Sequence, residues 1–231
     1  MRLLPRLLTL GLLLGHAPAS AQGVVVDQGT FSIRVGGAEA GTEEFVIRRA
    51  GLGSGDALFA SGVVAMTGSE ARQIRPLLRV EPLSGQAQEY QATVTGDDAA
   101  EIRLGLVPDG RRYVASIRSS AGAEDREFQA RPDTHVLEAG VAHHYHFMSG
   151  KRSGSDAFAL EPRSRRQLTL SVGAPEDVEL RLGPNVVTAR RVTFGAGTDD
   201  ERVVWYDRQG RVLRVEISAL GYVAERTDLV G

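Results

Sequence analysis

Apolar and polar residues alternate along most of the chain after residue 23, a pattern typical of antiparallel strands with one buried face. Residues 31–35 and 44–48 alternate most clearly at the start, and the glycines between them predict a hairpin. Further strands are predicted over 58–66, 74–81, 90–95, 101–107, 113–118, 157–160, 167–172, 178–182, 186–194, 203–206, 212–217 and 222–226. Because helices do not alternate with these strands, the pattern favours a large curved antiparallel sheet, a half-barrel or open barrel, over a parallel α/β fold.

Two prolines interrupt the strand predicted over 74–81. Pro76 and Pro82 cannot donate a ladder hydrogen bond, so they predict an edge strand or a ragged one.

One segment, residues 133–150, departs from the alternation and fits a period of 3.6 residues. On that period one side is apolar and comprises Leu137, Val141, Tyr145 and Met148. The opposite side holds Ala139, His143 and His146. We therefore predict one short helix packed on the sheet, although Gly140 weakens a helix.

The first 21 residues have the pattern of a secretory signal peptide. Arg2 and Arg6 precede the apolar run 7–14, and Ala19-Ser20-Ala21 supplies small residues for cleavage. We expect cleavage near Ala21, a mature protein of residues 22–231, and a periplasmic or secreted location. The chain contains no cysteine, so we expect neither a disulfide nor a lipid-modified N-terminal cysteine.

Length and charge narrow the possible partners. Residues 22–231 suit a single antiparallel β domain. The chain has 27 basic and 29 acidic residues, a net charge of −2, which does not favour nucleic acid as a partner. No apolar run after residue 14 approaches the roughly 20 residues of a membrane-spanning helix.

Histidines give the clearest candidate chemistry. His143-His144-Tyr145-His146 places three imidazoles in one turn, and His143 with His146 forms an i, i+3 pair that could share a metal. The alternative is a solvated polar helix face with His144 at its apolar margin. The helical zinc motif with histidines at i and i+4 is absent, so we assign no metal and no cofactor. Serines lie among glycines at 53–55 and 153–156, but neither segment makes a hydrolase elbow, and we assign no catalytic residue.

Both ends of the predicted mature chain carry motifs that resemble a known family. The opening segment 31–43 contains a glycine-x-x-x-glycine pattern at Gly37 and Gly41, and the closing segment 205–216 contains Trp205, Asp207, Gly210 and Arg211. This pairing resembles uncharacterised exported bacterial proteins similar to the periplasmic lipoprotein-carrier superfamily. The resemblance implies a half-barrel that wraps a helix and can shelter acyl chains.

The leading functional hypothesis is a non-enzymatic periplasmic protein that binds or carries a hydrophobic, lipid-like ligand. A curved sheet with one short helix leaves an apolar groove between them, which suits an acyl chain. Tyr145, Met148, Phe194 and Trp205 are the predicted lining residues, and the alternative is that they fill a core.

Two other hypotheses remain open at this point. The protein could be an envelope assembly or maintenance factor that pairs with a partner protein through an exposed strand edge. More remotely, it could be a metal-dependent hydrolase built on His143 and His146. The oligomeric state is not predicted.

Overall fold

The computed structural model describes residues 23–51, 55–68 and 71–229. The predicted signal peptide and part of the serine-containing segment 53–55 lie outside these ranges. The strands are β1 (Val24–Val35), β2 (Ala38–Ala50), β3 (Ala57–Met66), β4 (Arg72–Val80), β5 (Ala87–Gly96), β6 (Ala100–Leu106), β7 (Arg112–Ser119), β8 (Gly122–Gln129), β9 (His135–Val136), β10 (Asp156–Glu161), β11 (Arg166–Ser171), β12 (Glu176–Leu182), β13 (Asn185–Phe194), β14 (Arg202–Tyr206), β15 (Val212–Ile217) and β16 (Tyr222–Arg226). Two short 3₁₀ helices are η3 (His143–Met148) and η4 (Ser218–Leu220).

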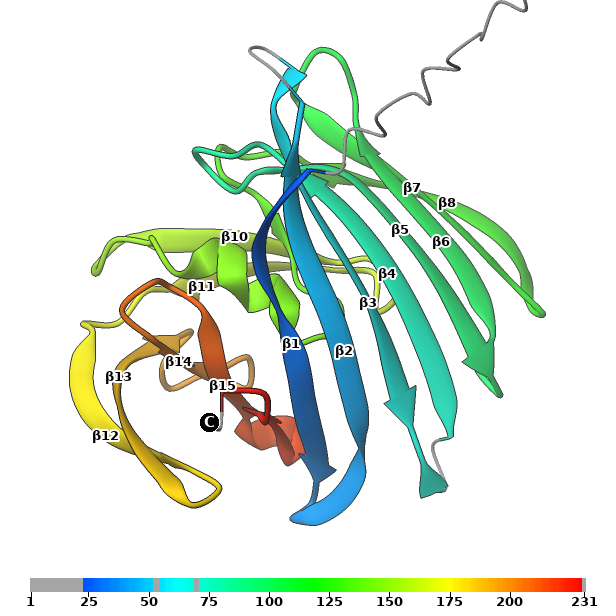
Figure 1. The fold of residues 1–231 in the computed structure, drawn as a ribbon. Coiled ribbons are helices and arrows are strands. Elements are labelled where there is room, and N and C mark those ends of the chain that lie inside the picture. Colours follow the sequence, from blue (N-terminus) through cyan, green and yellow to red (C-terminus); the bar gives the residue numbers. More distant parts are fainter. Residues whose placement is uncertain (1–22, 52–54, 69–70, 230–231) are drawn as a thin grey trace, which may run out of the picture.

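Most strands belong to one antiparallel sheet that bends around the rest of the chain. Its order is β12-β13-β14-β15-β16-β1-β2-β3-β4-β5-β6-β7-β8, so the first strand pairs with the last near the middle of the sheet. Figure 1 shows the sheet as an open, strongly curved wall rather than a closed cylinder. The predicted half-barrel is therefore confirmed.

The opening hairpin shows how sequence produces this sheet. Val35 pairs with Ala38, and the two-residue turn between them consists of Gly36 and Gly37, both with positive φ. Such a turn has the twist that antiparallel strands require, and glycine adopts it without steric cost. On β1 the odd-numbered Phe31 and Ile33 are fully buried, so period-two alternation turns one face toward the core.

Residues 135–171, which we call the covering segment, pack inside the curve of the large sheet. The segment contains β9, η3, β10 and β11, and its three strands form a separate sheet in the order β11-β10-β9. Figure 1 shows β10, β11 and the short helix enclosed between the two arms of the large sheet. Buried apolar side chains of the covering segment and of the large sheet form the main core, and Leu180, Leu182, Ala189 and Leu213 form a smaller, separate cluster.

The helix predicted over 133–150 is much shorter in the structure. Only His143–Met148 is helical, and it is a 3₁₀ helix, while His135 and Val136 form strand β9. Asp133 and Gly140 have φ of 59° and 85°, left-handed conformations that a continuous right-handed helix excludes. The apolar face predicted for this segment does point into the core, because Leu137, Val141 and Met148 are buried.

Two strands differ from the sequence prediction. β4 is an interior strand between β3 and β5, so the edge alternative is wrong, but the ragged alternative is confirmed, because its ladder with β3 is interrupted opposite Pro76, as a missing N–H requires. β8 was not predicted because its sequence, Gly-Ala-Glu-Asp-Arg-Glu-Phe-Gln, is almost entirely polar. It forms an edge of the large sheet, where polar side chains are compatible with pairing on one side only.

Within the ranges that the structure describes, no helix has the length and apolar character needed to cross a membrane.

Gly62 on β3 allows the covering segment to approach the sheet. A Cβ atom at this position would lie 2.7 Å from the Glu44 carbonyl oxygen and 3.1 Å from Cε1 of His143. We predict that Gly62→Ala lowers the free energy of unfolding by about 2 kcal/mol through overpacking. Gly105→Ala on β6 is the matched control, since nothing lies within 4 Å of that Cβ position. Urea unfolding followed by circular dichroism tests this, and equal effects of both variants would contradict it.

Candidate functional site

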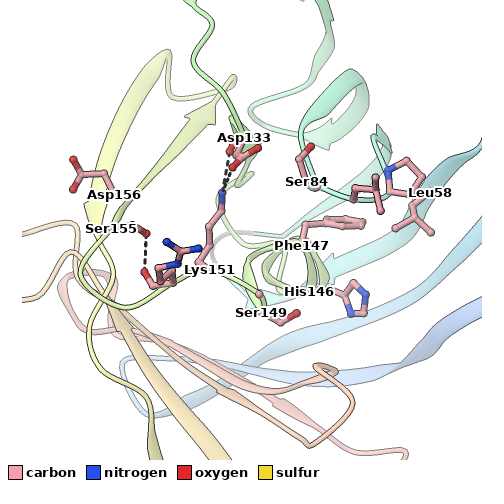
Figure 2. Close-up of a pocket in the computed structure, with 14 residues that line it drawn as sticks. Leu58, Ser84, Asp133, His146, Phe147, Ser149, Lys151, Ser155 and Asp156 are labelled. Carbon is pink, nitrogen blue, oxygen red and sulfur yellow. Dashed lines mark hydrogen bonds and ion pairs between the residues drawn. The ribbon is translucent and has the colours of Figure 1, made fainter. Parts of the chain in front are cut away.

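The candidate site is a pocket of about 560 Å³ where the end of η3 meets the loop between β4 and β5. This volume lies within the range of small-molecule sites. The residues that line it are Leu58, Pro82, Leu83, Ser84, Gly85, Asp133, His146, Phe147, Ser149, Gly150, Lys151, Arg152, Ser155 and Asp156. Figure 2 shows Leu58 and Phe147 on one side of Lys151, and Ser155 and Asp156 on the other. The pocket therefore has an apolar side and a polar side.

An ion pair separates the two sides. Lys151 Nζ lies 3.5 Å from Asp133 Oδ2 and donates to the Asp133 carbonyl at 3.4 Å. The Lys151 side chain is 12% exposed, and burial lowers its pKa, with Asp133 opposing the shift. Lys151 is the only lysine of the chain.

The loop between β4 and β5 is held in one conformation at the pocket rim. The Glu81 carboxylate accepts hydrogen bonds from the Leu83 and Ser84 backbone N–H groups and from the Ser84 hydroxyl. Hydrogen bonds from Ser84 lower the pKa of Glu81. The loop leaves the Leu83 side chain 94% exposed beside the pocket.

Glu43 on β2 holds the start of η3 in place through hydrogen bonds. Its carboxylate accepts the backbone N–H groups of Ala142 at 2.6 Å and His143 at 2.9 Å, and Nδ1 of His143 lies 2.6 Å from Oε1. The Glu43 and His143 side chains have no exposed surface, and the His143 ring stacks on Phe45. The first N–H groups of a helix have no acceptor within the helix itself, and the Glu43 carboxylate accepts two of them inside the core.

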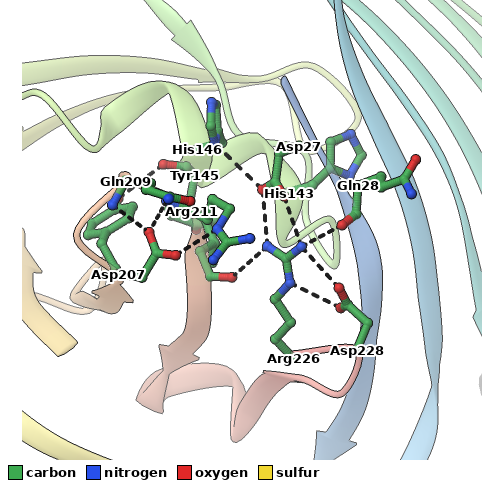
Figure 3. Close-up of polar contacts among 12 residues, drawn as sticks. Asp27, Gln28, His143, Tyr145, His146, Asp207, Gln209, Arg211, Arg226 and Asp228 are labelled. Atoms are coloured by element: carbon green, nitrogen blue, oxygen red, sulfur yellow. Dashed lines mark hydrogen bonds and ion pairs between the residues drawn. The ribbon is translucent and has the colours of Figure 1, made fainter. Parts of the chain in front are cut away.

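A buried ion pair joins β16 to β1, and Figure 3 shows its contacts. Arg226 on β16 donates to both carboxylate oxygens of Asp27 on β1, at 3.0 and 2.8 Å, and also contacts Asp228. Its guanidinium lies 5.3 Å from the centre of the Phe45 ring. Asp27 Oδ2 lies 3.9 Å from Nδ1 of His146, which lines the pocket. The Arg226–Asp27 ion pair thus lies beside His146, at the pocket-facing end of η3.

Glu138, at the start of the covering segment, is held by groups from two directions. The Tyr90 hydroxyl on β5 donates to it at 3.2 Å, and Arg163 Nε donates at 2.9 Å. Burial raises the pKa of Glu138, while Arg163 opposes the shift.

A similar cluster lies on the other arm of the sheet. There, the Arg202 guanidinium on β14 donates to the Glu161 carboxylate at 2.5 Å and to the Tyr145 hydroxyl at 3.0 Å.

The histidines do not form the solvated face that the sequence analysis considered. His143 and His144 are fully buried, because a carboxylate on the core face of β2 draws this part of the chain inward. Nδ1 of His143 faces Glu43, and His146 lies in the pocket wall. Among the described residues, no group of three or more His, Cys, Asp or Glu side chains is arranged to hold a metal ion.

The four predicted lining residues are not among those that line this pocket. Tyr145, Met148 and Phe194 are at most 3% exposed and belong to the main core. Trp205 is half-buried on the opposite face of β14, where its ring lies near the guanidinium groups of Arg191 and Arg214. None of the four lines the pocket of Figure 2, and their contact with a ligand stays a prediction.

Glu43, Asp27 and Arg226 were not identified from the sequence, although the sequence carries a signal for the two carboxylates. Glu43 has the same parity along β2 as the buried Phe45 and Ile47, and Asp27 has the parity of Phe31. A charged residue at a core position of a strand indicates a buried partner.

We predict that Glu43→Gln lowers the free energy of unfolding by about 3 kcal/mol, because the amide cannot accept all three hydrogen bonds of the buried carboxylate. Glu44→Gln is the matched control, since Glu44 is the next residue and lies exposed on the outer face. Urea unfolding followed by Trp205 fluorescence measures both variants. A Glu43→Gln protein as stable as Glu44→Gln would contradict the anchoring role.

Burial lowers the pKa of His135 from 6.5 to about 3. Between these values the unfolded chain binds a proton that the folded chain does not, so this histidine makes stability fall as pH drops below 6.5. The expected loss is ~1.4 kcal/mol per pH unit. We predict that His135→Leu removes this part of the pH dependence in urea unfolding between pH 6.5 and 4.5. An unchanged difference between the two pH values would show that His135 is already protonated in the folded protein.

Comparisons with known proteins give no family. No family model matches the chain, and no curated protein matches it. One solved structure is similar, the crystal structure of a beta-barrel-like protein of domain of unknown function DUF1849 from Brucella abortus. It has 11% sequence identity and a TM-score of 0.46, over 90% of this chain and 98% of that one. Since the likeness is this distant, the fold assignment stands on the strand pairing itself.

Proposed function

We propose that the chain is an exported, periplasmic, non-enzymatic binding protein for an amphiphilic, lipid-like ligand. The observation that carries the proposal is the pocket of Figure 2, in which an apolar side and a charged side line one space. Leu58, Leu83 and Phe147 offer contact area to an acyl chain, and the charged residues meet a polar head group.

The loop that carries Leu83 supports the proposal. A side chain that is 94% exposed loses contact with water when a tail packs against it, and that burial contributes free energy to binding. Since Glu81 already fixes the loop, little conformational entropy is lost on binding.

The packed interior limits which residues take part. Tyr145, Met148 and Phe194 are buried beneath or within the covering segment, so a ligand reaches them only if that segment moves. We include in the proposal the relation to the periplasmic lipoprotein-carrier superfamily, whose half-barrel can shelter acyl chains. The site proposed for this chain lies at the end of η3 rather than in the groove between sheet and helix.

Native mass spectrometry of the protein purified gently from the envelope fraction, with lipid analysis of an organic extract, tests the proposal. We predict a stoichiometric lipid mass, and about fivefold weaker rebinding by Leu83→Ser, which removes roughly 1 kcal/mol of apolar contact. Leu220→Ser is the control, since Leu220 is 56% exposed on η4 and does not line the pocket. A bare polypeptide whose melting temperature does not respond to fatty acids or phospholipids would contradict the proposal.

A second candidate function is envelope assembly or maintenance through an edge strand. β16 pairs with β1 only along Phe31–Val35, and in the described part of the chain no strand pairs with residues 24–28 on that side. Val24, Val25 and Val26 are 73%, 41% and 42% exposed there, which suits an added strand of a partner protein.

The edge of β1 can be tested by cross-linking in the envelope. We predict that Val25→Lys abolishes capture of a specific partner protein, while Val186→Lys on β13 leaves it intact. Capture of the same partner by all three proteins would exclude this edge.

A further inference from the structure

Four charged side chains line the pocket. Two of them form an ion pair with each other, and the other two have no partner among the described residues. Lys151 and Asp133 form the ion pair described above, at 3.5 Å. Arg152 and Asp156 are exposed, and within the part of the chain that the structure describes neither side chain has an ion-pair or hydrogen-bond partner. The pocket therefore offers one available cation and one available anion.

The backbone holds these two residues in place. Between them, the Ser155 hydroxyl and backbone N–H both donate to the Arg152 carbonyl, at 2.7 and 3.2 Å. The turn is tied to Val172, whose N–H donates to Ser155 and whose carbonyl accepts the Gly154 N–H. The available charges are thus carried by a turn that is fixed before any ligand arrives.

The apolar lining residues lie on the side of the Lys151–Asp133 ion pair that is away from Asp156. In Figure 2 the Lys151–Asp133 pair lies between Asp156 and the side formed by Leu58 and Phe147. A ligand that spans the pocket would present charged groups at one side and apolar groups at the other.

We infer that the ligand carries a zwitterionic head group, with its anion on Arg152, its ammonium on Asp156 and its tail toward Leu58 and Phe147. The inference rests on the proposed function and specifies its ligand class. A singly charged head group satisfies one residue and leaves the other unpaired beside a like charge, whereas a zwitterion satisfies both. A phosphate with a nearby ammonium occurs in zwitterionic phospholipids, and an apolar α-amino acid carries the equivalent pair of charges.

Calorimetric titration of the lipid-stripped protein at low ionic strength tests the inference with four probes. These are dihexanoylphosphatidylethanolamine, which is zwitterionic, dihexanoylphosphatidylglycerol, which is anionic, decyltrimethylammonium, which is cationic, and leucine. The zwitterionic phospholipid is expected to bind about fivefold more tightly than either singly charged amphiphile.

Variants of the two residues are expected to act in opposite directions. Arg152→Met should weaken binding of the zwitterionic phospholipid about fivefold and improve binding of decyltrimethylammonium. Asp156→Asn should remove the preference for the zwitterionic over the anionic phospholipid. Arg111→Met and Asp97→Asn are matched controls, because both residues are exposed and neither lines the pocket. The controls should leave every affinity unchanged.

The outcomes separate this inference from the proposed function. Equal binding of all three amphiphiles would overturn the zwitterionic head group and retain a lipid-binding protein. Binding of leucine alone would support the pair of charges and overturn the lipid-like ligand. Binding of no probe would overturn both.

Discussion

The buried carboxylate of Glu43 is the interaction on which the arrangement of the molecule depends. It accepts the N–H groups of Ala142 and His143 inside the core, where no strand is available to accept them. An unpaired backbone group at such a depth would cost about as much as a lost buried hydrogen bond, ~1–3 kcal/mol. By removing that cost, Glu43 allows a nearly helix-free segment to occupy the concave side of a curved sheet.

Other side chains of the large sheet also pair with backbone groups of the covering segment. Side chains of the large sheet donate to its carbonyl oxygens: Tyr206 to Tyr145, Tyr222 to Gly140 and Arg190 to Ser149. The segment thus gains from side chains the hydrogen bonds that regular secondary structure normally supplies. This explains why the concave face carries tyrosines, arginines and carboxylates among its apolar residues. It also fixes the end of η3, whose last residues form one wall of the pocket.

The strands could be predicted from the sequence because their alternation records which face is buried. The closing hairpins were located nearly to the residue, since turn residues bound them, whereas the strands of the opening hairpin are longer than the predicted 31–35 and 44–48. β8 could not be found in this way, because an edge strand with polar side chains shows no alternation. The helix was overestimated because apolar residues at 137, 141, 145 and 148 face the core from irregular backbone as well as from a helix.

The candidate site was less predictable than the fold. Three of the predicted lining residues, Tyr145, Met148 and Phe194, are large side chains of the interior, and such residues mark a core more often than a ligand site. The pocket depends instead on Leu83, Lys151, Arg152 and Asp156, which come together only through tertiary packing of a loop, a helix end and a turn. Their sequence neighbourhoods resemble ordinary polar loops, so no local pattern marks them.

The most direct test of the central claim is hydrogen–deuterium exchange of the wild-type protein and Glu43→Gln, measured segment by segment under conditions in which both are folded. If Glu43 anchors the covering segment, exchange should accelerate in residues 135–150, while β5, β6 and β7 keep wild-type protection. Unchanged protection of residues 135–150, or an equal loss of protection throughout the sheet, would contradict the account.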